Sequence, residues 1–159
     1  MKTLVAYATK YGAAKKCAER LVGKLEGEVD LINIKEKQNI NINNYDKVII
    51  GSSVYMGKIR KEARKFCDKY LEELKSKKLG LFNSCMSREE EAREQLKNSF
   101  SDELVQSAEV TGIFGGAFDF DKMNFLEKMA IKKIAGTDKS ESNIREENIT
   151  EFASKINAC

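Results

Sequence analysis

The sequence contains no histidine, no proline and no tryptophan among its 159 residues. Without histidine, Ser-His-Asp and Cys-His catalysis are excluded, and so is any zinc site that relies on imidazole. The cysteines form no C-x-x-C pair, which argues against a thioredoxin-type redox motif and a zinc knuckle; they are Cys17, Cys67, Cys85 and Cys159. We therefore nominate no catalytic residue and no metal ligand.

Long apolar runs and a large excess of one charge are also missing. The apolar start, residues 1–7, is too short for a signal peptide or a membrane span. Lys and Arg number 28 against 25 Asp and Glu, so no nucleic-acid partner is expected. With 42% hydrophobic residues the chain can bury a core, and its length suits a single domain over residues 1–159. Unpaired cysteines favour a cytoplasmic location.

Short apolar runs alternate with segments of helical periodicity. Strands are predicted at residues 3–7, 28–33, 47–51, 79–83 and 110–115, and helices at 14–25, 59–74, 87–98, 123–134 and 146–156. Residues 36–44 are expected to form a loop. Strands this apolar are typical of a parallel sheet that is covered on both faces. Right-handed crossovers then give a doubly wound α/β domain with five strands.

In such a sheet, ligands bind beyond the carboxyl ends of the strands. The first loop, residues 8–14, places Thr9, Lys10 and Gly12 before a helix, where backbone N–H groups and the helix dipole favour an anion. It matches neither the dinucleotide fingerprint nor the P-loop. The alternative is a plain strand-to-helix turn in which Gly12 relieves strain.

The loops after the third and fourth strands complete the candidate site. Residues 51–58 are small or flexible, so they let a flat ligand approach, and Tyr55 and Met56 offer stacking surface; alternatively, both side chains pack on the next helix. In residues 83–87, Ser87 is a predicted helix N-cap ahead of acidic residues. Cys85 is expected to be a small buried filler rather than a redox thiol.

These loops resemble those of the flavodoxin-like family. Residues 2–12 (KTLVAYATKYG) are similar to the flavodoxin start, whose first loop holds the phosphate of FMN. Residues 44–53, 115–117 and 132–138 most resemble bacterial flavodoxin-type, menaquinone-dependent protoporphyrinogen oxidases and their relatives. The resemblance covers nearly the whole chain. It implies a three-layer flavodoxin-like sandwich with a five-stranded parallel sheet in the order 2-1-3-4-5.

The resemblance also implies a set of FMN contacts. The phosphate is expected among Thr9, Lys10, Tyr11, Gly12, Ala13 and Ala14. The isoalloxazine ring is expected between two further segments: Ser52, Ser53, Val54, Tyr55, Met56 and Gly57, and Asn83, Ser84, Cys85, Met86 and Ser87. Family members usually carry hydroxyl residues where Tyr11 and Ala14 stand. Binding is therefore expected to be weaker than in a typical flavodoxin.

The resemblance predicts an FMN-binding redox protein that transfers electrons through a non-covalent flavin. One alternative is a protoporphyrinogen- or quinone-linked FMN oxidoreductase, and a second is a cofactor-free binding module of the same fold. The partner is accordingly a redox protein or a small quinone- or porphyrinogen-like compound. Cations near the predicted site would receive an anionic partner, or they form a solvated face; they are Lys10, Lys58, Arg60, Lys61 and Arg64.

The helix predicted at 123–134 allows a peripheral membrane contact. Met123, Leu126, Ala130 and Ile134 line one face of this helix, and lysines lie elsewhere around it. The alternative is that this stripe packs on the rest of the domain.

Overall fold

The computed structural model describes residues 1–118, 124–135 and 141–159. Its central sheet contains five parallel strands: β1 (Lys2–Ala8), β2 (Glu28–Asn33), β3 (Lys47–Tyr55), β5 (Lys78–Ser84) and β6 (Ala108–Ile113). They are ordered β2-β1-β3-β5-β6. This confirms the predicted order 2-1-3-4-5 and the parallel, doubly wound arrangement.

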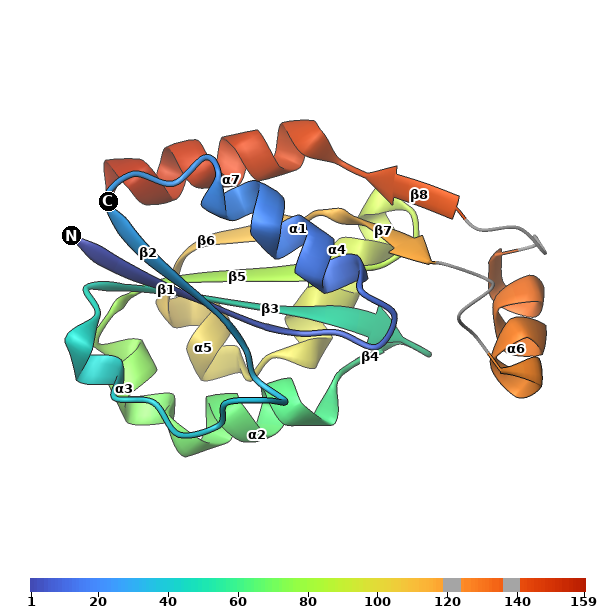
Figure 1. The fold of residues 1–159 in the computed structure, drawn as a ribbon, viewed down its shortest axis with the longest axis horizontal. Helices are drawn as coiled ribbons and strands as arrows, with labels where there is room; N and C mark the ends of the chain where they lie inside the picture. Colours follow the sequence, from blue (N-terminus) through green and yellow to red (C-terminus); the bar gives the residue numbers. More distant parts are fainter. Residues whose placement is uncertain (119–123, 136–140) are drawn as a thin grey trace.

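Helices cover both faces of the sheet (Figure 1). On one face lie α1 (Ala13–Val22) and α7 (Glu146–Ala158), and on the other lie α2 (Lys61–Lys69), α3 (Leu71–Lys75), α4 (Glu89–Ser99) and α5 (Asp102–Ser107). Successive strand residues point to opposite faces, so Leu4 and Val5 belong to different cores. This explains why residues 3–8 of β1 are all buried.

Some elements differ from the sequence prediction. The segment predicted as one helix over 59–74 begins instead with a short strand, β4 (Lys58–Ile59), which pairs antiparallel with β3. It is then interrupted at Tyr70, whose backbone leaves the helical region. The Tyr70 hydroxyl accepts the N–H of Ile40 (3.0 Å) and donates to the Gln38 carbonyl (3.2 Å). Tyr70 therefore ties the helix break to the 36–44 loop, which itself contains one 3₁₀ turn, η1 (Ile42–Asn44).

The predicted strand at 110–115 is in fact two strands. β6 ends at Ile113, and after Phe114 the chain turns through Gly115 (φ 76°) into β7 (Gly115–Phe118). β7 pairs antiparallel with β8 (Glu141–Ile144) in a separate two-stranded sheet. Between them runs α6 (Phe125–Ala135), at the carboxyl-end side of the main sheet (Figure 1). Met123 of the predicted helix lies outside the described residues, and so do residues 136–138 of the 132–138 segment that carries part of the family resemblance.

The turn between β3 and β4 has an unfavourable residue. Met56 has a φ of 54°, in the left-handed region, and it is followed by Gly57 at 78°. Two-residue hairpin turns with both φ values positive favour Asn-Gly. Met56→Asn is therefore expected to raise the free energy of unfolding by about 1 kcal/mol, because residues other than Gly and Asn are strained in this backbone conformation. Urea denaturation measures the gain, and Met56→Leu is the control that should show none. An equal midpoint for the two variants would contradict this prediction.

Candidate functional site

Two hydroxyl groups hold the loop from β1 to α1, one within the loop and one on β3. Thr9 Oγ1 accepts the N–H of Gly12 (2.9 Å), and Ser53 Oγ accepts the N–H of Lys10 (3.2 Å). Gly12 is the N-cap of α1 at φ 91° and ψ 0°, and no side chain caps this helix. Within the described part of the chain, no hydrogen bond uses the N–H groups of Tyr11, Ala13 or Ala14. The start of α1 thus presents unpaired donors.

The side chain of Lys10 connects three parts of the structure. Its Nζ lies 4.0 Å from the ring centre of Tyr55 and 5.4 Å from that of Tyr11, within the range of cation–π attraction. It also lies 3.3 Å from Glu127 Oε2 on α6. The two tyrosine rings meet edge to face at 6.2 Å. The first and second predicted loops are therefore in direct contact, with a cation beside both of their aromatic side chains.

Tyr11 has a hydroxyl group with no partner. Its oxygen is buried and makes no hydrogen bond in the structure. Leaving such a group unpaired costs about 1–3 kcal/mol. The Tyr11 hydroxyl is therefore suited to a hydrogen bond with a bound molecule.

Parts of the second and third predicted loops are strand in the structure, because β3 extends to Tyr55 and β5 to Ser84. Several of the predicted side chains in these segments bond within the protein. The Ser52 hydroxyl donates to the Ser53 carbonyl (2.9 Å) and accepts the N–H of Arg60 (3.0 Å). Asn83 Nδ2 donates to the Ala92 carbonyl (3.0 Å), and Ser84 Oγ donates to the Gly115 carbonyl (2.8 Å). These three side chains are buried and fix the loops. The exposed parts of the second loop are Met56 and Gly57, beside half-buried Val54 and Tyr55.

The structure corrects the capping role predicted for Ser87. The N-cap of α4 is Arg88, and no side chain caps the helix. Ser87 instead uses its carbonyl, which accepts a hydrogen bond from Arg145 Nη2 (3.1 Å). The three glutamates of the first turn of α4 already stabilise its positive end.

β7 covers the third loop. The sequence does not predict this contact. A Cβ atom on Gly116 would lie 2.8 Å from the Cys85 carbonyl carbon and 2.9 Å from Met86 Sδ. Only glycine allows the strand to approach this closely. The sequence signal for this close approach is the Gly115-Gly116 pair. The sequence also does not predict a role for Glu127 on α6. Its approach to Lys10 depends on the path of the chain between β7 and β8.

A flavodoxin-domain family profile matches residues 4–144. The chain belongs to the flavodoxin-domain family. Protoporphyrinogen IX dehydrogenase (quinone) of Escherichia coli (strain K12) is 23% identical over 155 residues, covering 92% of this chain and 86% of that protein. A flavodoxin, WrbA-like protein from Agrobacterium tumefaciens is similar in structure, with a TM-score of 0.63, 18% identity and coverage of 99% and 96%. Oxidised Flavodoxin 1 from Bacillus cereus also scores 0.63, with 17% identity and coverage of 98% and 97%. The family resemblance drawn from residues 2–12 and 44–53 is thus confirmed.

The thiols of this flavodoxin-family chain are free, and three are buried. Burial raises the pKa of Cys17 to about 11 and that of Cys67 to about 12. It also raises the pKa of Cys85, which is 7% exposed. Both properties agree with the expectation that Cys85 is a filler, because thiol reactivity requires thiolate and access. Only Cys159 is partly exposed.

We expect a single fast thiol in the native protein. At pH 8, an aromatic disulfide reagent should label Cys159 rapidly, while Cys17, Cys67 and Cys85 stay protonated and shielded. All four should react in guanidinium chloride. In the control variant Cys159→Ser, the fast phase should disappear. Rapid labelling of Cys85 in that variant would show that its thiol is accessible.

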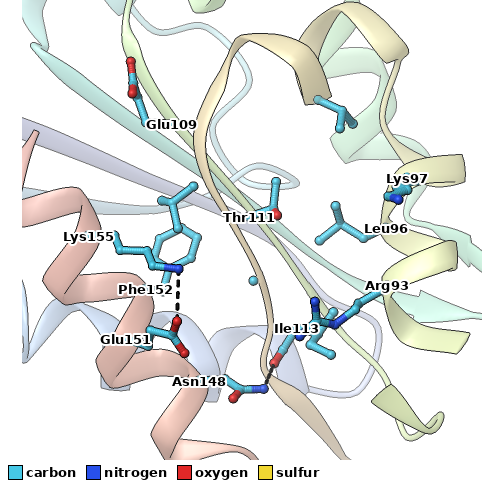
Figure 2. A pocket seen from close by; sticks show the side chains of 13 residues that line it. Arg93, Leu96, Lys97, Glu109, Thr111, Ile113, Asn148, Glu151, Phe152 and Lys155 are labelled. Carbon is cyan, nitrogen blue, oxygen red and sulfur yellow. Dashed lines mark hydrogen bonds and ion pairs between the residues drawn. The ribbon is translucent and has the colours of Figure 1, made fainter. Parts of the chain in front are cut away.

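A groove runs along the outer edge of this flavodoxin-like sheet (Figure 2). It has a volume of about 490 Å³ and lies between α4, β6 and α7. None of the predicted FMN contacts lines it. Lys155 lies 3.0 Å from Glu151, and Asn148 Nδ2 donates to the Ile113 carbonyl (2.9 Å). These polar groups bind one another, and since no predicted FMN contact lines the groove, the loops at the strand ends are the better candidate site. No cluster of metal-binding side chains occurs in the residues that the structure describes.

Proposed function

We propose that this chain is a single-domain redox protein that binds FMN without a covalent bond at the loops after β1, β3 and β5. The observation that carries the proposal is the start of α1. Every other described α-helix has an acidic residue in its first turn, whereas α1 has none. Its positive end therefore remains available for an external anion such as a phosphate.

The residues around this helix end suit a phosphate group. The N–H groups of Tyr11, Ala13 and Ala14 are unpaired, and Lys10 supplies a cation. Nothing lies within 4 Å of a Cβ position on Gly12, so the loop has open space in front of it. Where the family usually carries hydroxyl residues, Tyr11 has a buried hydroxyl with no hydrogen-bond partner, and fully buried Ala14 contributes only its backbone.

FMN, when bound, supplies one- or two-electron transfer. The chain contributes binding, orientation and electrostatics. Met56 and Gly57 at the tip of the β3–β4 turn are exposed next to Tyr55 and form a surface for a flat ring. The loop of residues 83–87 lies under β7 and would limit water access from that side.

An absorption spectrum of the purified protein and a fluorescence titration with FMN test this proposal. We expect bound flavin, or quenching of FMN fluorescence at submicromolar protein concentration. A colourless protein that does not quench FMN would contradict the proposal and leave a cofactor-free binding module.

A second candidate is an FMN oxidoreductase that acts on a quinone- or porphyrinogen-like compound. The named activity of the Escherichia coli relative favours it, and so do exposed cations next to the second loop, Lys58, Lys61 and Arg64. These would attract an anionic substrate or an acidic partner. Rapid turnover of FMN-loaded protein with a quinone would favour the enzyme, whereas a low midpoint potential without turnover would favour an electron carrier. The free cysteines support a cytoplasmic location.

The exposed face of α6 supports a peripheral membrane contact. Phe125, Leu126 and Met129 are 74%, 75% and 55% exposed, and Lys132 and Lys133 are exposed on the same helix. Among the described helices, none is both long and apolar enough to cross a membrane. Surface attachment through apolar side chains and lysines would be the available mode.

The expected result is flotation of the protein with vesicles that contain anionic phosphatidylglycerol, and loss of flotation in Leu126→Gln. The control variant Leu31→Gln changes an exposed leucine on β2, far along the chain from α6, and should still float. Failure of the unmodified protein to float would remove the membrane contact.

A further inference from the structure

Glu127 uses both carboxylate oxygens. Oε1 accepts the N–H of Asn124 (3.2 Å), and Asn124 Oδ1 accepts the N–H of Glu127 (2.8 Å). This reciprocal pair is a capping box at the start of α6. Oε2 lies 3.3 Å from Lys10 Nζ. At 20% exposure, Glu127 is the least exposed acid among the ion pairs of the described residues. One carboxylate therefore both starts α6 and attaches it to the first loop.

The cation that Glu127 engages is the one that a phosphate on the first loop would require. Lys10 is confined, because its ammonium lies beside the Tyr11 and Tyr55 rings and its backbone N–H donates to Ser53 Oγ. Carboxylates and phosphates accept the same charge-assisted hydrogen bonds from an ammonium group. Two anions next to one partly buried ammonium repel each other. Occupation by one thus disfavours the other.

We propose that Glu127 holds the phosphate position on Lys10 and that the cofactor phosphate displaces it, so that flavin binding releases α6 from the first loop. This inference rests on the proposed function and adds a competing group within the chain. Selectivity follows, because a flavin without phosphate gains nothing from displacing Glu127. The exposed apolar face of α6 then has a different position in the FMN-bound protein and in the FMN-free protein.

A double-mutant cycle tests the exchange by fluorescence titration with FMN and with riboflavin, which lacks the phosphate. Glu127→Gln keeps a capping-box residue and should tighten FMN binding about fivefold, the scale of a partly exposed ion pair. Riboflavin affinity should not change. In the Lys10→Met background, Glu127→Gln should have no effect on FMN. The matched control is Glu62→Gln, which removes a similarly half-buried acid that pairs with Arg60, and it should leave FMN affinity unchanged.

Limited trypsin digestion reports on α6 directly, because exposed Lys132 and Lys133 lie on it. FMN should speed cleavage there several-fold, and riboflavin should not. Equal effects of Glu127→Gln on both flavins, or protection of α6 by FMN, would overturn the exchange while leaving FMN binding intact. If neither the unmodified chain nor any variant binds either flavin, the proposed function and the exchange both fail.

Discussion

Replacing Gly12 by valine is expected to abolish detectable FMN binding. Gly12 has a φ of 91° at the N-cap of α1, a conformation in which a β-branched residue is strained by about 1–3 kcal/mol. There is open space around its Cβ position, so the damage comes from the backbone rather than from a clash. Relaxation of the loop would redirect the N–H groups of residues 11–14, and each lost hydrogen bond to a charged phosphate costs about 1.5–3 kcal/mol. Affinity should therefore fall at least about a hundredfold.

The control for this prediction is Gly12→Asn. Asparagine tolerates the left-handed region better than other non-glycine residues, so this variant should bind FMN within a few-fold of the unmodified chain. Circular dichroism should show that both variants keep the fold. If Gly12→Val bound FMN normally, the phosphate would have to lie elsewhere.

Replacing Gly51 by alanine is expected to cause the largest loss of stability. An added Cβ would lie 1.9 Å from Phe82 Cζ, and Phe82 is the residue paired with Gly51 on the neighbouring strand. The Phe82 ring has little room to move, because it stacks on Phe114 (4.5 Å) and meets Phe152 edge to face (6.4 Å). Overpacking of this kind costs about 3 kcal/mol, which lowers the melting temperature by roughly 6–12 °C for a chain of this size.

Gly23→Ala provides the comparison. Gly23 ends α1 in a helical conformation (φ −63°), and an added Cβ would meet its nearest atom, the Arg20 carbonyl oxygen, at 3.5 Å. The melting temperature of Gly23→Ala should stay the same as that of the unmodified protein or rise slightly. Trimming the ring with Phe82→Leu should recover part of the stability of Gly51→Ala. A neutral Gly51→Ala would show that the three-ring cluster is more mobile than its packing indicates.

The central sheet was predictable because its signals are local. The inner parallel strands are buried on both faces, so runs such as residues 48–54 appear as continuous apolar or small residues between helical periods. Positions set by distant contacts were not predictable. The break at Tyr70 depends on carbonyl and amide groups some thirty residues away. The β7–β8 pairing joins segments separated by α6.

The candidate site shows the same division. The sequence points to Gly12, Lys10 and Tyr55, because turn geometry and side-chain chemistry depend on neighbouring residues. The sequence does not show that the side chains of Ser52, Asn83 and Ser84 bond within the protein, since their partners lie before α2, in α4 and in β7. The FMN titrations test whether the predicted residues hold the cofactor.

The groove beside β6 has a consequence for self-association. An outer strand normally offers a row of unpaired backbone groups to which another chain can add. Here the Asn148 side chain donates a hydrogen bond to the Ile113 carbonyl. Charged Glu109 and polar Thr111 are exposed along the same strand (Figure 2). The flanking helices α4 and α7 line both sides of this edge. This edge of the sheet is thereby protected against pairing with the edge strand of another molecule.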